Sequence, residues 1–298
     1  MRITLKQLVV FDAVARLGFV NQAAEEISLS QSATSMALRD LEKNLDVSLF
    51  HRHKKKLTLN ENGRRLQPLV RSLLIQARDI ESNVSTLQGK LTIGASSTIG
   101  QFLIPGICAK FVTKNPDVRI HLVVSKTAQL IEDVDKLILD IGFIEAPCNR
   151  QSLHMIPVGG DRLSLVVGKG HRLAAKKRVK IRDLAGERWI LLDVPSATRT
   201  LLTIGIRNQV GALDIALETN NIEVIKEAVK CGMGISCLST LAVKDELKSG
   251  ELVCLALEGL SLERRFNAIY RSDVYHGSVQ KEFINYVKAN LPSGVISD

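Results

Sequence analysis

The sequence predicts an α/β protein with an N-terminal winged helix-turn-helix, a long connecting helix and a larger C-terminal α/β region. Three observations lead to this prediction. Apolar residues recur at helical spacing over the first 45 residues, a seven-residue repeat follows between residues 66 and 87, and strand-like and helical segments alternate after residue 90. The three parts are expected to cover residues 1–60, 61–88 and 91–298.

Three helices are predicted in the N-terminal part. The first covers residues 5–17 and stops at Gly18, whose missing Cβ suits a helix end. Asn21 is expected to cap a short second helix, and Ser30 is expected to cap the third after a tight turn at 28–30. Two short helices joined by such a turn are typical of a helix-turn-helix, although any small three-helix core would show the same periodicity.

The outer side of the third helix carries small polar residues and one arginine, which are Gln31, Ser32, Ser35 and Arg39. Short polar side chains let a helix approach phosphates, and Gln and Arg can form paired hydrogen bonds with base edges. A basic run then separates the apolar pair at 49–50 from an alternating strand at 57–59. Its position favours a wing that lies along phosphates over a merely solvated loop. The residues of this run that we expect to contact DNA are Arg52, Lys54, Lys55 and Lys56.

A long helix is predicted next, with Asn60 as its N-cap. Its apolar residues recur in alternating steps of four and three, which is the repeat of a coiled-coil seam between two subunits. The predicted dimerisation seam consists of Leu66, Val70, Leu73, Ala77, Ile80, Val84 and Leu87. Polar residues between them, such as Arg71, suit solvent, and Pro68 predicts a kink or a helix start nearby. An amphipathic helix packed on its own domain is the alternative.

Strand candidates after residue 90 alternate with helical segments, which favours parallel α/β layers; they cover 91–94, 119–125, 138–144, 163–168 and 189–192. In such folds ligands bind beyond the carboxyl ends of strands, commonly at helix N-termini. Polar residues occupy these places: Ser96, Ser97 and Thr98 after the first strand, and Thr198, Arg199 and Asn221 at later helix starts. Together they predict a cleft for a small anion, although helix caps and turns alone would also explain such residues.

The N-terminal third closely resembles the LysR-type transcriptional regulators. The matching segments are Ala23-Ala24, Leu29–Ser35, Leu41-Glu42, Leu49–Arg52 and Leu57–Gly63. The resemblance extends through residues 91–100, 140–148 and 223–238, where it is greatest to the YeiE-type branch, which is linked to sulfur-anion sensing. Thr34, Met36 and Ile222 depart from the residues usual in these relatives.

This resemblance implies that the connecting helix pairs subunits into a homodimer or homotetramer. It also implies an effector domain of two α/β subdomains that resemble periplasmic binding proteins. Subdomain I would comprise 91–162 and 266–298, and subdomain II would comprise 163–265, with crossings near 159–163 and 264–268. The effector would bind between them, with sulfite or a related sulfur oxyanion as first choice and an amino acid or small carboxylate as the alternative.

Glu145 is a further pocket residue that the resemblance implies, and its charge is opposite to that of the other expected contacts. A carboxylate repels an anion unless one of the two carries a proton. A protonated oxyanion or a protonated Glu145 would remove the conflict. Alternatively, Glu145 faces away from the ligand or binds the ammonium group of an amino acid.

Charge and composition limit the class of protein. Residues 1–90 hold 14 Lys and Arg against 9 Asp and Glu, so the N-terminal third is the more basic part of a chain with net charge +9, which suits nucleic acid. Five cysteines without a C-x-x-C pair predict reduced, mostly buried thiols, with a redox pair of Cys231 and Cys237 as the alternative. The start lacks an apolar leader and no apolar run is long enough to span a membrane, so we expect a cytoplasmic protein.

Competing functions fit less well. The sequence contains no G-x-S-x-G, P-loop, G-x-G-x-x-G, H-E-x-x-H or zinc-ligand spacing, so we expect no enzyme activity, no cofactor and no metal. A transporter's solute-binding protein would need a secretion signal and no helix-turn-helix, and an architectural DNA-binding protein would not need the large α/β region. The expected partners are double-stranded promoter DNA, a small anionic effector, further copies of this chain and, as a candidate, RNA polymerase, but no membrane.

Overall fold

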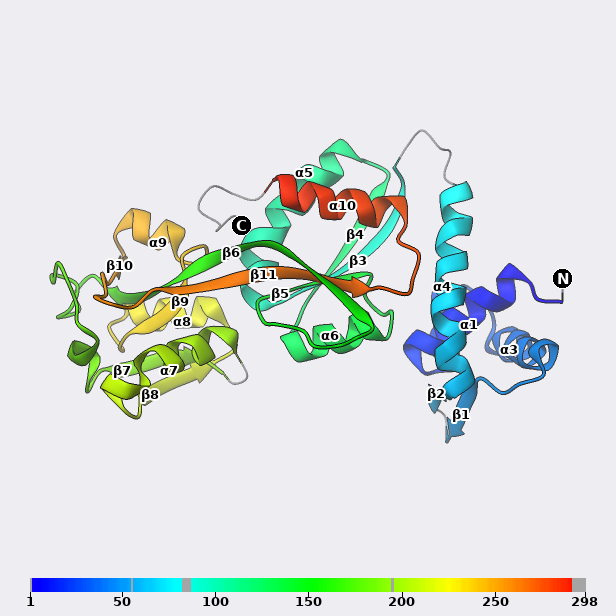
Figure 1. Cartoon of the computed structure of the whole chain (residues 1–298), viewed down its shortest axis with the longest axis horizontal. Coiled ribbons are helices and arrows are strands. Elements are labelled where there is room, and N and C mark those ends of the chain that lie inside the picture. Colours follow the sequence, from blue (N-terminus) through cyan, green and yellow to red (C-terminus); the bar gives the residue numbers. More distant parts are fainter. Residues whose placement is uncertain (1, 55, 82–86, 194–195, 291–298) are drawn as a thin grey trace.

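The computed structural model describes residues 2–54, 56–81, 87–193 and 196–290 (Figure 1). An N-terminal domain, a first α/β lobe (lobe I) and a second α/β lobe (lobe II) follow one another along the long axis of the molecule. The helix α4 (Glu61–Glu81) stands between the N-terminal domain and lobe I. The predicted fold class, a winged helix-turn-helix followed by an α/β region, is confirmed.

The N-terminal domain consists of α1 (Leu5–Leu17), α2 (Val20–Glu26), α3 (Gln31–Leu45) and a hairpin of β1 (Phe50–His53) and β2 (Lys56–Leu59). Two predicted helix boundaries are confirmed: Gly18 is left-handed at φ 73°, and Ser30 Oγ accepts a hydrogen bond from the Ala33 N–H at 3.2 Å. The expected cap at Asn21 is wrong, since α2 already begins at Val20. The left-handed turn at Gly18 leads the chain into α2 without a capping side chain.

A compact core holds these helices and the hairpin together. The rings of Phe11 in α1 and Phe50 in β1 lie 5.6 Å apart between centroids, and Leu38 and Leu41 of α3 are buried beside them. Thr34, which departs from the family pattern, is also buried, and its hydroxyl donates to the Ser30 carbonyl at 3.0 Å. Because α3 buries this side, its opposite side is left to solvent.

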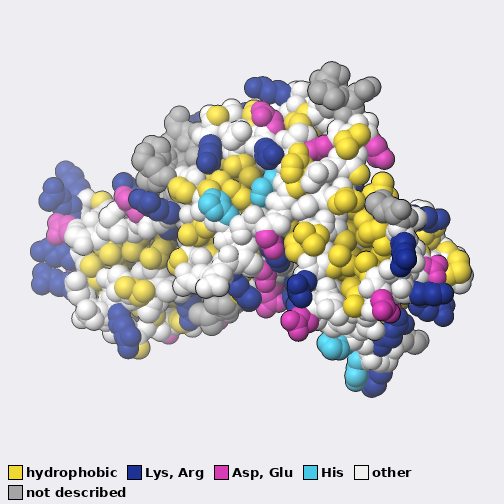
Figure 2. Space-filling view, turned by 45° about the vertical axis from the view of Figure 1, so that its right-hand side comes forward, with side chains coloured by type: hydrophobic (Ala, Val, Ile, Leu, Met, Phe, Trp, Pro, Cys, Tyr) yellow, Lys and Arg dark blue, Asp and Glu magenta, His cyan; other side chains and the backbone are white. Residues whose placement is uncertain are grey.

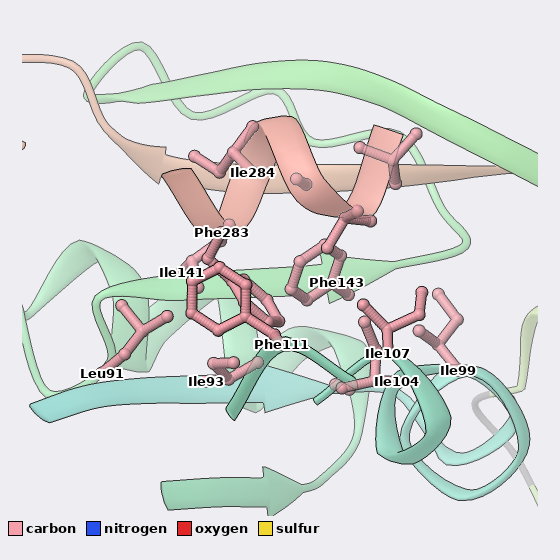
Figure 3. Close-up of a cluster of buried hydrophobic side chains, with 14 of the residues drawn as sticks. Leu91, Ile93, Ile99, Ile104, Ile107, Phe111, Ile141, Phe143, Phe283 and Ile284 are labelled. Carbon is pink, nitrogen blue, oxygen red and sulfur yellow. The ribbon is translucent and has the colours of Figure 1, made fainter. Parts of the chain in front are cut away.

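Lobe I is built on three parallel strands, with β3 (Gly89–Ala95) between β4 (Val118–Val124) and β5 (Ile141–Ile144). Its helices are α5 (Ile104–Lys114), α6 (Thr127–Asp135) and α10 (Ser278–Ala289), and a short π-helix, η1 (Ile99–Leu103), precedes α5. Phe111, Phe143 and Phe283 fill the core between sheet and helices (Figure 3). Parallel pairing places the carboxyl ends of β3 and β5 at one edge of the sheet.

Two long antiparallel strands, β6 (Leu153–Gly168) and β11 (Leu262–Arg271), run through both lobes, and their register shifts between Phe266 and Asn267 (Figure 1). β6 also pairs with β9 (Ser236–Ser239) and β10 (Leu252–Cys254). The expected parallel layers are therefore only part of the sheet. The chain passes between the lobes once in each direction, so the two crossing strands pair antiparallel.

Lobe II contains the parallel pair β7 (Arg188–Leu192) and β8 (Asp214–Thr219). Its helices are α7 (Ala197–Val210), α8 (Ile222–Lys230) and α9 (Lys244–Ser249), together with the short 3₁₀ turn η2 (Ile181–Leu184). Trp189 is fully buried in its main core, which shares no residue with the core of lobe I. Each lobe therefore has a hydrophobic core of its own.

The buried side of α4 is partly polar and joins the N-terminal domain to lobe I. Arg71, which was expected to face solvent, is buried and donates to Asp12 of α1 at 3.1 Å and to Asp140 of lobe I at 2.7 Å. Gln67 Nε2 donates to the carbonyl of Lys136 at 3.0 Å. The solvent-facing prediction for Arg71 is wrong, because carboxylates from two separate bodies compensate its buried charge.

The start of α4 agrees with the prediction. Asn60 Oδ1 accepts a hydrogen bond from the Gly63 N–H at 2.9 Å, which confirms Asn60 as the cap. Pro68 lies inside the helix, so α4 begins well before it. The predicted seam, in contrast, is not one exposed stripe: Leu66 and Val70 pack into the N-terminal core, whereas Leu73 and Ile80 are 46% and 82% exposed.

The remaining seam positions differ in the same way. Ala77 is half-buried, Leu87 lies beyond the helix and packs on the core of lobe I, and Val84 lies outside the described residues. Leu69, which the heptad pattern omits, is 66% exposed beside Leu73 and Ile80. Two turns of an α-helix take about 7.2 residues, so residues spaced seven apart shift gradually around the helix. Over three heptads this shift carries the pattern from the buried side of α4 to its exposed side. The exposed apolar row of α4 therefore consists of Leu69, Leu73 and Ile80.

The cysteines are less buried than expected. Cys231 and Cys254 are exposed, because one ends α8 and the other lies on the edge strand β10. Only Cys237 is buried among the five. Burial raises the pKa of the Cys237 thiol to about 12, which disfavours the thiolate needed for disulfide exchange. Cys237 is therefore poorly suited to the alternative redox pair with Cys231.

The exposed apolar row of α4 leads to a prediction about assembly. Leu73→Asp combined with Ile80→Asp should shift the full chain toward the monomer, because paired copies of α4 would bring like charges together. Thermal stability should stay close to wild type, since both side chains are exposed. Val70→Ala is the control: it should lower the unfolding free energy by about 1–3 kcal/mol without changing assembly. Sedimentation velocity measures the assembly state, and an unchanged profile for the double variant would place the dimer contact elsewhere.

Candidate effector cleft and DNA-binding surface

A cleft of about 620 Å³ between the two lobes is lined by six of the seven residues expected to contact an effector. From lobe I come Ser96, Ser97 and Thr98 after β3 and Glu145 after β5, and from lobe II come Thr198 near the start of α7 and Asn221 at the cap of α8. These side chains meet because strand ends and helix starts from both lobes face the same space.

Arg199 is the predicted residue that the structure does not bring into the cleft. Its Nη1 donates to Glu218 of β8 at 2.7 Å and to the Leu192 carbonyl at 3.4 Å. The helix turns by about 100° between successive residues, so Thr198 faces the cleft while Arg199 faces β8. The expected role of Arg199 as an anion contact is therefore corrected to an ion pair within lobe II.

Arg264 supplies the cationic group that the sequence analysis missed. It lies on the crossing strand β11, lines the cleft and is only 5% exposed. Its Nε and Nη2 donate to Asp161 at 2.6 and 2.8 Å, and its Cζ lies 5.7 Å from the centre of the Phe266 ring. Burial lowers the pKa of this guanidinium, but the hydrogen bond to Asp161 and the charges of Glu145 and Asp161 raise it above its ordinary value overall. Arg264 is therefore a fixed positive charge at the floor of the cleft.

The same guanidinium reaches both lobes. Nη2 donates to Thr98 Oγ1 of lobe I at 3.1 Å, and Nη1 donates to Thr198 Oγ1 of lobe II at 3.0 Å. Nη1 also lies 3.5 Å from Glu145 Oε1, whose side chain is 6% exposed. Glu145 therefore faces the cleft floor, with part of its charge compensated by Arg264.

The polar groups that remain for a ligand come mainly from the first loop of lobe I. Ser96 is 4% exposed, and its Oγ has no hydrogen-bond partner among the described residues. A buried hydroxyl without a partner is costly unless something else bonds to it. Asn221, in contrast, uses its Oδ1 to cap α8, accepting from the Glu223 N–H at 2.9 Å.

A second cation at the cleft was also missed. Lys126, next to α6 of lobe I, donates to Asp193 at the end of β7 in lobe II at 2.9 Å, and both residues line the cleft. This ion pair spans the two lobes at a partly exposed position, where it contributes little stability by itself. Of the two missed cations, Arg264 carried a signal in the sequence: it is a charged residue at one of the implied crossings, between apolar strand positions.

The residues of α3 that were predicted to contact DNA lie on the side that faces away from the domain core. Gln31, Ser32 and Arg39 are exposed and Ser35 is half-buried. The Arg39 Nε donates to the Ser35 carbonyl at 3.3 Å, so its stem lies along the helix. Met36 is 58% exposed on this helix and adds an apolar contact to a surface otherwise suited to hydrogen bonding.

The predicted wing is a two-stranded hairpin in which Phe50 pairs with Leu59 and His53 pairs with Lys56. Lys54 is exposed in its turn at φ 53°, Lys56 is exposed on β2, and Lys55 lies outside the described residues. Arg52 is not free: its Nη2 pairs with Glu42 of α3 at 3.0 Å. Glu42 also accepts the Leu49 N–H at 2.8 Å, so it ties the wing to α3 and sets their relative position.

Among the residues that the structure describes, no group of three or more His, Cys, Asp or Glu side chains is placed to hold a metal ion. In that part of the chain, no helix is both long and apolar enough to cross a membrane.

Two protein-family models match the chain. The model of bacterial regulatory helix-turn-helix proteins of the lysR family matches residues 5–64, and the model of the LysR substrate binding domain matches residues 85–292. Among curated proteins, the HTH-type transcriptional regulator YeiE of Escherichia coli (strain K12) is 36% identical over 293 residues, which cover 98% of this chain and 100% of that protein.

Two solved structures are similar in fold. A full-length OxyR variant from Pseudomonas aeruginosa has a TM-score of 0.76 at 21% identity, over 97% of this chain and 94% of that one. The CcmR regulatory domain from Synechocystis PCC6803, in complex with 2-PG, has a TM-score of 0.62 at 26% identity, over 68% of this chain and 97% of that one.

The exposed side of α3 leads to a prediction about DNA binding. Arg39→Ala should cost roughly 1–3 kcal/mol of affinity for the native operator and relax its base preference, because a bidentate base contact is lost. Replacing Lys54 and Lys56 by Gln should instead weaken binding to all sequences and flatten its salt dependence. Fluorescence anisotropy across a salt series measures both effects, with exposed Arg65→Ala as the control. An unchanged salt slope for the double Lys variant would rule out phosphate contacts by the wing.

Proposed function

Because this chain belongs to the LysR family of DNA-binding transcriptional regulators, we propose that its cleft binds a small oxyanion and thereby changes how the protein holds promoter DNA. Sulfite is the first candidate, followed by related sulfur oxyanions. The family consists of transcriptional regulators with a ligand-binding domain, so the function is control of gene expression. In this proposal the cleft binds the molecule to which the regulator responds. We propose that the protein acts in the cytoplasm, where promoter DNA and RNA polymerase are found.

The observation that carries this proposal is the hydroxyl of Ser96. It is buried, has no hydrogen-bond partner among the described residues, and lines the cleft beside Ser97 and Thr98. Short hydroxyl side chains in a row suit a compact ligand with several acceptor oxygens. Arg264 and Lys126 place cationic groups in the same space, although each is paired with a carboxylate. Among the described residues, the cleft lining includes no aromatic side chain on which a planar ligand could stack.

Glu145 favours a protonated oxyanion over a fully ionised one. Its buried carboxylate accepts from Arg264 and would repel a dianion at the same site. A monoprotonated oxyanion can donate to this carboxylate while its other oxygens accept from Ser96 and from the loop that follows. Near neutral pH a substantial part of sulfite carries one proton, whereas sulfate carries none.

An amino acid is the second candidate effector, and the same carboxylate is the reason. Glu145 would pair with the ligand ammonium group while the hydroxyls of Ser96 and Ser97 accommodate its carboxylate. Because Arg264 already compensates part of the Glu145 charge, this arrangement is the weaker of the two. The CcmR regulatory domain, which was solved with 2-PG, supports a small ligand in a domain of this type.

Ligand binding would act on the DNA-binding domains through the orientation of the lobes. The cleft is lined from both lobes, so a ligand held by both favours one relative orientation. A ligand can shift a conformational equilibrium only by its difference in affinity for the two states. Lobe I contacts α4 through Asp140 and Arg71, and α4 is packed into the N-terminal core. We propose that this contact passes the change in orientation to the DNA-binding pair.

Ser96→Ala tests the proposed site. It should weaken sulfite binding by about tenfold, because a hydrogen bond of roughly 1.4 kcal/mol is lost, while stability and ligand-free DNA affinity stay near wild type. Isothermal titration calorimetry of the full chain with sulfite, sulfate and a panel of amino acids provides the measurement. Ser236→Ala is the matched control, since Ser236 is also buried and unpartnered among the described residues but lies on β9 outside the cleft lining.

Two results would contradict the proposal. If Ser96→Ala bound sulfite as tightly as wild type and the Ser236→Ala control, the loop after β3 would not be the anion site. If no oxyanion gave a heat signal while an amino acid bound, the effector class would be wrong, and Glu145 would be reassigned as the ammonium partner.

A further inference from the structure

Positive charge is concentrated in lobe II as well as in the wing and the start of α4. Residues 169–188, which run from the end of β6 to the first residue of β7, hold eight Lys and Arg against two Asp and Glu, a net charge of +6 in a chain of net charge +9. All eight cations are exposed. We call them the lobe II basic surface: Lys169, Arg172, Lys176, Lys177, Arg178, Lys180, Arg182 and Arg188. Figure 2 shows Lys and Arg side chains gathered at the end of the molecule opposite the N-terminal domain, on the left.

The fold anchors the backbone that carries these cations. The segment is anchored by four apolar side chains that are buried in the core of lobe II: Leu173, Val179, Ile181 and Leu184. Their charged neighbours therefore point outward from an ordered turn and 3₁₀ segment rather than from a loose tail. Cations on an ordered backbone lose less backbone freedom on binding a partner than cations on a flexible segment do.

Most of this charge is uncompensated. Three of the eight form ion pairs: Arg172 with Glu187, Lys176 with Asp183 at 3.2 Å, and Arg178 with Glu258 at 3.9 Å. The other five form no salt bridge within the residues that the structure describes; they are Lys169, Lys177, Lys180, Arg182 and Arg188. Like charges at this density repel one another, which an anionic partner would relieve.

The residues between the cations indicate the chemistry of that partner. Gly170, Ala175, Ala185 and Gly186 are the exposed uncharged residues of the segment, and no large hydrophobic side chain is exposed there. Protein interfaces are usually centred on buried aromatic or aliphatic side chains, which this surface lacks. Small residues between cations instead allow a close approach to a row of phosphates, which requires charge and hydrogen-bond donors alone.

We propose that the lobe II basic surface binds the phosphate backbone of DNA outside the segment held by the winged helix-turn-helix. This inference rests on the DNA-binding role of the chain but not on the identity of its effector. Lobe II lies at the far end of the protomer from the N-terminal domain (Figure 1), so such a contact involves DNA that continues past the operator or bends toward lobe II. Phosphate contacts carry no base preference, so the surface adds affinity and shape selectivity rather than sequence recognition.

The test compares full-length variants of equal charge on a random-sequence duplex. In the first variant, four unpaired cations of the lobe II basic surface become Gln: Lys177, Lys180, Arg182 and Arg188. In the matched control, four exposed lysines of α5, α9 and α10 become Gln: Lys110, Lys244, Lys248 and Lys288. Fluorescence anisotropy gives the slope of log affinity against log salt concentration. The slope should become shallower by roughly 2 to 4 in the first variant, at about 0.9 per lost phosphate contact, and should barely change in the control.

A second measurement does not depend on removing charge. A photoactivatable crosslinker attached at Lys177→Cys, with exposed Cys231 and Cys254 replaced by Ser, should join lobe II to DNA. The same crosslinker at Lys288→Cys should not do so.

One further variant distinguishes failure of this inference from failure of the DNA-binding role. A wing variant, with Lys54 and Lys56 replaced by Gln, is measured on the same duplex. If it loses slope while the lobe II variant matches wild type and lobe II yields no crosslink, the inference is overturned and DNA binding stands. In that case, weaker transcription by the lobe II variant with purified RNA polymerase would assign the surface to an acidic protein. Failure of wild type to bind any DNA would overturn both.

Discussion

The burial of the Arg264 guanidinium constrains how the two lobes sit against each other. A charge removed from water must have all its donors satisfied within the protein, and here Thr98 of lobe I and Thr198 of lobe II accept from the same group. Rotation of one lobe against the other would lengthen one of these hydrogen bonds. Asp161 of the crossing strand β6 also accepts from this guanidinium, so Arg264 is held by the two strands that both lobes share. The cleft therefore places its ligand next to the group that already joins the two lobes.

Much of the local structure could be predicted because short-range rules decide it. Gly18, Ser30 and Asn60 end or begin helices through contacts within a few residues of the chain. The cleft residues of the loop after β3 could be predicted for a topological reason, because parallel strands bring their carboxyl ends to one edge of the sheet. Glu145 after β5 lies at the same edge, but only the family resemblance implied it. The prediction for Arg199 was wrong because a sequence pattern places a residue on a helix but does not reveal which neighbouring strand its side chain contacts. Here Arg199 pairs with Glu218 of β8.

What could not be predicted involves partners that are distant in sequence. Arg71 meets Asp140, and Lys126 meets Asp193, across separations for which spacing carries no information. The apolar side of α4 illustrates the same limit: periodicity identifies the residues that share a side of a helix, but not whether a domain or solvent covers them. Averaging charge over whole regions also hid the lobe II basic surface, since acidic residues elsewhere in residues 91–298 balanced it.

The position of Arg71 has a consequence for how proteins of this design are divided into fragments. Its guanidinium is shared between Asp12 and Asp140, so a fragment that begins after α4 keeps the second carboxylate and loses the cation that neutralises it. Asp140 also accepts from the Thr92 N–H at 2.8 Å, at the amino ends of the two strands whose carboxyl ends carry the cleft loops. In an isolated effector domain, the negative charge of Asp140 at the base of the central strands would therefore no longer be compensated by Arg71. Ligand affinities measured on such a fragment describe a molecule whose electrostatics differ from those of the intact regulator.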